Sequence, residues 1–336
     1  MTTIEVIPED YIVWPNGGGL VHKSATVDKS ARIRKGAVVE AEAMIGERVV
    51  IGLEAIISKN AEIRAEAVIG DNSKVGYNTT IGVKAIISDK VDIGDEVLIG
   101  NSTTIGHDTK IADWVAIGCG VEVEYNISIG CNAVIADKCK IKREAKISAE
   151  VKVAERVGID DKVEIGYKAS ILPGVELHYG VVIGDNSTVG YDTTIGHDTK
   201  IAEEVSIYQN ATIEGNVRIG VRSIIGRDAK IKEYVKVGAY SRIAHKAYIG
   251  GNTTLADEVV IGEDAKVEAY CVVGQKSKVQ NKAVIGSNSK IADDVTVGVG
   301  IKIGEGTEIP ENTVIPPLTE LPAEEINTQY QSVNFR

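Results

Sequence analysis

The chain has 336 residues, of which 48 are acidic and 37 are basic, for a formal net charge of −11. This sign of charge argues against a nucleic-acid footprint, and no apolar stretch is long enough for a transmembrane helix. Aromatic residues make up only 4% of the chain, whereas glycine supplies 35 residues. The core must therefore be built from small and branched aliphatic side chains, which disfavours a layered sandwich or a Rossmann-type fold.

The first residues lack a basic segment followed by an apolar one, so we expect no signal peptide and a cytoplasmic location. Residues 1–20 include Trp14 and the flexible run Asn16-Gly17-Gly18-Gly19. We expect this segment to be an N-terminal cap or a linker, because the open end of a repetitive structure exposes unpaired backbone groups.

A repeat of six residues begins at Val21 and continues without a slip to Ile315. All (315 − 21)/6 + 1 = 50 of these positions hold Ile, Val or Leu. A small residue stands two places before nearly every one, as Ala25 and Ser73 do, and Gly or Asn often stands three places after. Two inward positions separated by an outward one predict a short strand, and the next three residues predict a sharp corner. A period of six excludes a helix of 3.6 residues per turn.

This pattern resembles the hexapeptide repeat of the left-handed parallel β-helix, and the resemblance covers residues 21–315. It implies an all-β fold, a single β-solenoid with three hexads per coil, which is nearly 17 coils with no loop excursions. The left hand is implied by the resemblance alone. Residues 316–336 open with two prolines that stop the repeat, and we expect a short helix around Leu321–Ile326 or an extended arm.

Residues 18 apart stack on successive coils, so the outward residues form three faces. One face carries Met44, Leu98, Val134, Ile224 and Val260, and a long apolar stripe marks an interface more often than chance does. Proteins that resemble this chain are usually parallel homotrimers. We therefore expect a homotrimer through this face, with scattered apolar residues of no consequence as the alternative.

Two segments resemble the catalytic stretch of hexapeptide-repeat acyltransferases that act on sugar nucleotides and on lipid A precursors. The stronger is HDTKIA from His197, followed by NATIEG from Asn210, and HDTKIA from His107 repeats its first half. The triplet IAH that ends at His245 is similar to one in the lipid A N-acyltransferases, although the residue after it departs from their pattern.

The resemblance implies that one histidine is a general base, which removes a proton from a sugar hydroxyl or amine as that group attacks an acyl thioester. The candidates are His197, His107 and His245, and a carboxylate would orient the ring: Asp198 beside His197, or Asp89 one coil below His107. The co-substrate would be acetyl-CoA or an acyl-carrier protein thioester, with no bound cofactor. We expect no metal, because no two histidines stand five residues apart as the γ-class carbonic anhydrases require.

The alternative function is that of a non-catalytic trimeric rod, whose length serves as a spacer, a filament or part of an appendage. The repeat has no insertion, its coils exceed what an acyl-donor groove requires, and both His-Asp corners lie opposite the apolar face. These features favour a rod, whereas the segment at His197 favours an enzyme. The sequence leaves both open.

Overall fold

The computed structural model describes residues 9–317, and all regular structure in that range is β. Two three-residue strands come first, β1 (Tyr11–Val13) and β2 (Leu20–His22). Every later strand has two residues, and strand number n begins at residue 6n + 8, from β3 (Thr26–Val27) to β51 (Val314–Ile315). These 51 − 2 = 49 strands make about 16 coils of three strands each. The predicted all-β, parallel β-helix is confirmed.

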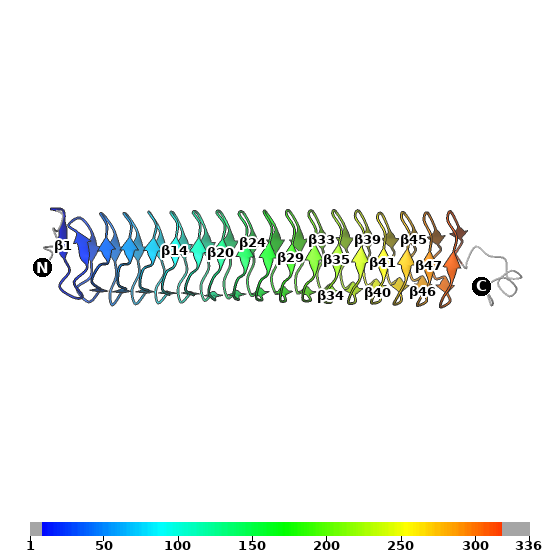
Figure 1. The fold of residues 1–336 in the computed structure, drawn as a ribbon, viewed down its shortest axis with the longest axis horizontal. Helices are drawn as coiled ribbons and strands as arrows, with labels where there is room; N and C mark the ends of the chain where they lie inside the picture. Colours follow the sequence, from blue (N-terminus) through cyan, green and yellow to red (C-terminus); the bar gives the residue numbers. More distant parts are fainter. Residues whose placement is uncertain (1–8, 318–336) are drawn as a thin grey trace, which may run out of the picture. The chain divides into compact units, whose positions relative to one another are not determined.

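The chain divides into two compact units, Met1–Lys162 and Val163–Arg336, which are built alike. Within each unit, each strand from β2 onward pairs in parallel with the third strand after it, so that residues 18 apart lie opposite each other. Three ladders of strands result, and Figure 1 shows strands of one ladder following one another along each unit. We call them ladder 1 (β2, β5 and every third strand after), ladder 2 (β3, β6 and so on) and ladder 3 (β4, β7 and so on).

The corners between strands depend on the third residue after each inward aliphatic. This residue adopts a left-handed backbone at almost every corner, with φ of 59° at Asn72 and 63° at Gly120. Glycine and asparagine tolerate this conformation best, as the sequence predicts. Aspartate takes the same place at Asp108 (φ 56°) and Asp198 (φ 55°), and both of these follow a histidine.

The core consists of the two inward residues of each hexad. Ala37 and Val39 are both fully buried, and the same alternation of a small and a branched residue recurs through both units. The outward residue between them is half-buried or exposed, as Val38 is. Cys139 and Cys271 fill small inward positions, where burial raises the pKa of each thiol and so disfavours the reactive thiolate.

Buried hydroxyls at the small inward positions join one coil to the next. The Ser73 hydroxyl donates to the Ser88 carbonyl at 2.8 Å and accepts the Val91 N–H at 3.0 Å. In several coils that stack on an alanine at this position, the backbone N–H bonds directly to the carbonyl three residues before it. Ala85, which stacks on Ala67, bonds in this way to Gly82 at 3.2 Å. The serine hydroxyl therefore bridges the N–H and the carbonyl that otherwise bond to each other. No buried side-chain nitrogen or oxygen in residues 9–317 lacks a partner.

Replacing Ser73 with Ala should lower the free energy of unfolding by about 1 kcal/mol, because it removes two buried hydrogen bonds that the turn can only partly restore. The measurement is the urea midpoint followed by circular dichroism. Ser128→Ala is the matched control, because Ser128 points outward and is exposed. Equal shifts for the two variants would contradict the role of the buried hydroxyl.

Residues 9–20 cover the start of the first unit. Strand β1 pairs with β2 in antiparallel fashion, and the Trp14 indole N–H donates to the Ala31 carbonyl at 2.9 Å. The turn between these strands uses Gly17 and Gly18, whose φ values of 123° and 84° exclude most other residues. The helix or arm expected around Leu321–Ile326 lies outside the described residues.

Candidate functional site

The segment TTIGHDTKIA occurs twice, at 103–112 and at 193–202, and both copies fold alike. In each, the chain leaves a ladder 3 strand, turns a corner at His-Asp and enters a ladder 1 strand. The strands are β16 (Thr104–Ile105) and β17 (Lys110–Ile111) in the first unit, and β31 (Thr194–Ile195) and β32 (Lys200–Ile201) in the second.

The left-handed backbone at the aspartate brings each carboxylate next to the preceding imidazole. Nδ1 of His107 lies 2.7 Å from Asp108 Oδ2, and Nδ1 of His197 lies 3.2 Å from Asp198 Oδ2. The hydrogen bond to His107 lowers the pKa of Asp108, which keeps it an acceptor. A carboxylate at Nδ1 holds the proton there and leaves the lone pair on Nε2, the arrangement that a general base needs. Both histidine side chains are about half exposed, at 54% and 53%.

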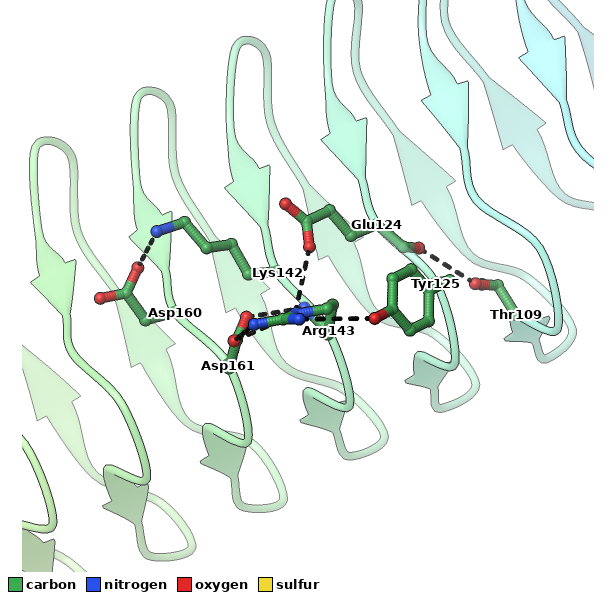
Figure 2. A network of polar contacts seen from close by, with 7 residues as sticks. All are labelled: Thr109, Glu124, Tyr125, Lys142, Arg143, Asp160 and Asp161. Atoms are coloured by element: carbon green, nitrogen blue, oxygen red, sulfur yellow. Dashed lines mark hydrogen bonds and ion pairs between the residues drawn. The ribbon is translucent and has the colours of Figure 1, made fainter.

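In the first copy, the aromatic ring of Tyr125, which lies on the next coil, covers His107. The Tyr125 ring stacks on the imidazole with centroids 4.8 Å apart and an interplanar angle of 5°. Arg143, one coil further, approaches the Tyr125 hydroxyl at 3.5 Å, and its Nε and Nη2 both donate to Oδ2 of Asp161 in an ion pair (Figure 2). This pair lowers the pKa of Asp161 and raises that of Arg143. Four consecutive corners are thus tied together.

A shallow groove of about 870 Å³ lies along this column of corners. The cations that line it are already paired: Arg143 with Asp161, and Lys142 with Asp160 at 2.7 Å (Figure 2). The groove therefore presents a stacked His107 and neutralised charges rather than an open cationic surface.

In the second copy, the residue one coil above the histidine is Gly215. A Cβ built there would lie 2.6 Å from Nε2 of His197, so the imidazole lies directly over the glycine backbone. Gly215 is buried although it stands at a corner, which agrees with this cover. The two identical segments therefore differ in the coil stacked on them: a tyrosine ring covers one imidazole, whereas a glycine makes room for the other.

His245 lies in a different setting, on a corner between ladders 2 and 3. Its Nδ1 bonds to the Arg227 carbonyl at 2.7 Å, and its Nε2 lies 3.0 Å from Nη2 of the same arginine. Both ring nitrogens are thus engaged, and the side chain is 21% exposed. This geometry supports a role in tying two coils together more than a role in proton transfer.

The carboxylate of Asp89 accepts the Asp71 N–H at 2.8 Å, so it faces the coil below. His107 contacts Asp108 instead. Neither the stacking of Tyr125 on His107 nor the position of Gly215 against His197 was predicted from the sequence. The offset of 18 residues is the signal that indicates both.

The predicted contact face is ladder 2. On it Met44 and Leu98 are 50% exposed and Val134 is 43% exposed, whereas Ile224 and Val260 are half-buried. In the first unit Leu98, Ala116 and Val134 lie opposite one another in register. The sequence analysis missed a second apolar run, on ladder 3 of the same unit, formed by Val50, Val68 and Ile86.

Within residues 9–317, no three His, Cys, Asp or Glu side chains come together as metal ligands. Over the same range, the structure holds no helix of the length and apolarity that a membrane span requires.

No protein-family model matches the chain, and neither does any curated protein. Among solved structures, it is similar to a UDP-N-acetylglucosamine acyltransferase from Campylobacter jejuni, with 22% identity, 57% of this chain, 66% of that chain and a TM-score of 0.21. The enzyme of the same name from Bacteroides fragilis has 23% identity over 47% of this chain and 64% of that chain, with a TM-score of 0.22. A putative acetyltransferase from Bacillus cereus has 19% identity over 49% of this chain and 78% of that chain, with a TM-score of 0.25.

The chain thus spans slightly less than two thirds of either acyltransferase of the first pair. At these identities and TM-scores, the similarity to those enzymes assigns neither a substrate nor a catalytic residue to this chain. By its six-residue repeat and its three parallel ladders, the chain has the hexapeptide-repeat β-helix fold.

Proposed function

We propose that this protein is an acyltransferase in which His197 is the general base. The observation that carries the proposal is the exposed His197–Asp198 pair, whose Nδ1 is held by a carboxylate while Nε2 lies over Gly215. Among the three candidate histidines, His107 is stacked on a tyrosine and His245 has both nitrogens engaged. His197 combines a ring held by Asp198 with a neighbour, Gly215, that has no side chain, and 53% of the His197 side chain is exposed.

In the proposed reaction, Nε2 of His197 takes a proton from a hydroxyl or amine of the acceptor as that atom attacks the thioester carbonyl carbon. The carbon–sulfur bond then breaks, and the departing thiolate receives the proton back from the imidazolium. Asp198 holds the ring and stabilises its positive charge while the proton is on it. The proposed acceptor is a sugar or a sugar nucleotide, and the proposed donor is acetyl-CoA or an acyl-carrier thioester.

The test is to incubate the protein with each thioester and a panel of amino sugars and sugar nucleotides, and to measure thiol release. We expect release that depends on the acceptor. Absence of turnover for every pair, together with absence of thioester binding by calorimetry at millimolar concentration, would contradict the proposal.

One observation favours the second candidate, a non-catalytic rod. The strand register of six residues has no interruption between β3 and β51, so no loop rises beside His197 to enclose a substrate. A rod predicts that neither thioesters nor sugars bind, whereas an enzyme on this surface requires a second wall. A partner subunit is one way to supply it.

We propose that the protein is a homotrimer through ladder 2. Because Leu98 and Val134 are exposed and lie in one register, Leu98→Asp combined with Val134→Asp should place uncompensated charge in the contact and yield monomers by light scattering. The control is Lys74→Ser with Lys110→Ser, which changes residues with the same spacing on ladder 1 and adds no carboxylate beside Asp92, which lies in register with both. A trimer that survives the first pair but dissociates with Val68→Asp and Ile86→Asp would move the contact to ladder 3.

A further inference from the structure

Three cations lie side by side on ladder 1, and the first of them follows the second His-Asp corner directly. They are the outward residues of β32 (Lys200–Ile201), β35 (Arg218–Ile219) and β38 (Lys236–Val237). Lys200 pairs in register with Arg218, and Arg218 pairs in register with Lys236. With strands about 4.8 Å apart, the three charges span about 10 Å, which is close to the Debye length at physiological ionic strength.

None of these three side chains has an ion-pair partner among the described residues. The neighbouring carboxylates are used elsewhere: Asp198 by His197, Glu204 by Arg222 and Glu214 by Lys232. Glu203 and Glu233 stand on the corners that flank the face, not on the strands themselves.

Like charges directly opposite one another in a sheet are destabilising, and the chain as a whole is acidic. A run of three unpaired cations in such a chain is therefore a feature that an external anion would relieve.

The surroundings leave the cations accessible. Lys200, Arg218 and Lys236 are all exposed, and the residue after each of their strands is small, namely Ala202, Gly220 and Gly238. The row ends at uncharged residues on both sides, because Lys200 faces Val182 and Lys236 faces Thr254.

The first copy of the segment lacks this arrangement. There Lys110 pairs in register with Asp92 on one side and with Ser128 on the other. The identical segments thus differ twice in what is stacked on them. The second copy has Gly215 over its histidine and Arg218 beside its lysine, where the first copy has Tyr125 and Ser128.

We propose that Lys200, Arg218 and Lys236 form an anion-binding strip, which holds the diphosphate group of a co-substrate next to His197. An arginine between two lysines suits this group, because guanidinium binds phosphate oxygens in pairs and ammonium adds charge on either side. The inference rests on the proposed function and deepens it, since it makes the second copy the working one. Coenzyme A and a sugar nucleotide both carry a diphosphate, and the experiment separates them.

The test is calorimetric titration of inorganic pyrophosphate into the wild-type protein and into Arg218→Ser, which introduces the residue of the first copy. We expect binding to the wild type and at least about tenfold weaker binding to the variant. Lys110→Ser, at the same position of the first copy, should bind as the wild type does. Titrations with free coenzyme A and with UDP, in both proteins, then show which of the two loses affinity with Arg218.

A second readout does not depend on activity or on the identity of the substrate. Without pyrophosphate, Arg218→Ser should unfold at the same temperature as the wild type or a higher one, because one charge of the repulsive row is gone. Pyrophosphate should raise the unfolding temperature of the wild type and leave that of the variant nearly unchanged.

Pyrophosphate binding that is absent from the wild type, or equal in Arg218→Ser, would overturn the strip. If turnover depends on His197 while binding is equal in both proteins, the strip fails and the proposed function stands. If pyrophosphate binds through Arg218 and no thioester turns over, the strip stands and the proposed function fails.

Discussion

Replacing His197 with Ala is expected to slow acyl transfer by about 10²–10⁴-fold, the usual contribution of a general base. The loss should appear in kcat, because the imidazole acts on a proton that moves only in the transition state. The thermal unfolding temperature should change little, since the side chain is 53% exposed and buries little surface. Steady-state kinetics and thermal unfolding of the same preparation check both statements.

Two other histidines provide internal comparisons. His107→Ala removes the same ring from an identical segment, and its turnover should stay within about twofold of the wild type. His245→Ala should lower the unfolding temperature, because it breaks the bonds to Arg227 that join two coils. Turnover that is unaffected by all three substitutions would place the chemistry at other residues.

Gly215 offers a further check on the geometry of His197. Its φ is not in the left-handed range, so alanine strains no backbone there, but the added Cβ would meet the imidazole. Gly215→Ala should therefore displace the ring and lower kcat without removing any polar group. Retention of full activity would mean that the position of the ring over Gly215 does not matter for the reaction.

The fold could be predicted from the sequence because its determinants are local and repeated. Each hexad specifies an inward small residue, an inward aliphatic residue and a corner. One atypical hexad does not obscure the repeat, because the hexads on either side keep the register. The ladder offset of 18 residues then follows from three hexads per coil. The positive φ at Asn72 and Gly120 follows from the same reasoning.

The candidate site could be predicted only in part. The two His-Asp corners follow from the sequence, but the setting of each ring depends on a side chain from the next coil. The offset of 18 identifies that neighbour, yet exposed corner side chains have several rotamers, and the sequence does not choose among them. For this reason Asp89 was expected to orient His107, whereas the Asp89 carboxylate accepts the Asp71 N–H. The sequence also left open the engagement of His245 by Arg227.

The strongest effect on stability is expected in the core of the second unit. Ile231 is fully buried in β37 (Lys230–Ile231), between Ile213 and Ile249 of the adjacent strands. Ile231→Asp removes the apolar side chain and buries a carboxylate with no partner, for a loss of about 5 kcal/mol or more. Each coil contacts only its neighbours, so the damage should begin in the coils next to β37. Hydrogen exchange should show amides there losing protection first.

Two milder variants test the same prediction if Ile231→Asp fails to fold. Ile231→Ala leaves a cavity without a charge and should cost about 2–5 kcal/mol in urea unfolding. Lys230→Ala changes the exposed neighbour on the same strand and should cost about 0.5 kcal/mol or less. The contrast tests the facing of a two-residue strand directly, because adjacent positions point to opposite sides. Comparable losses at the two positions would mean that the aliphatic repeat does not face the interior, which would remove the physical basis of the fold.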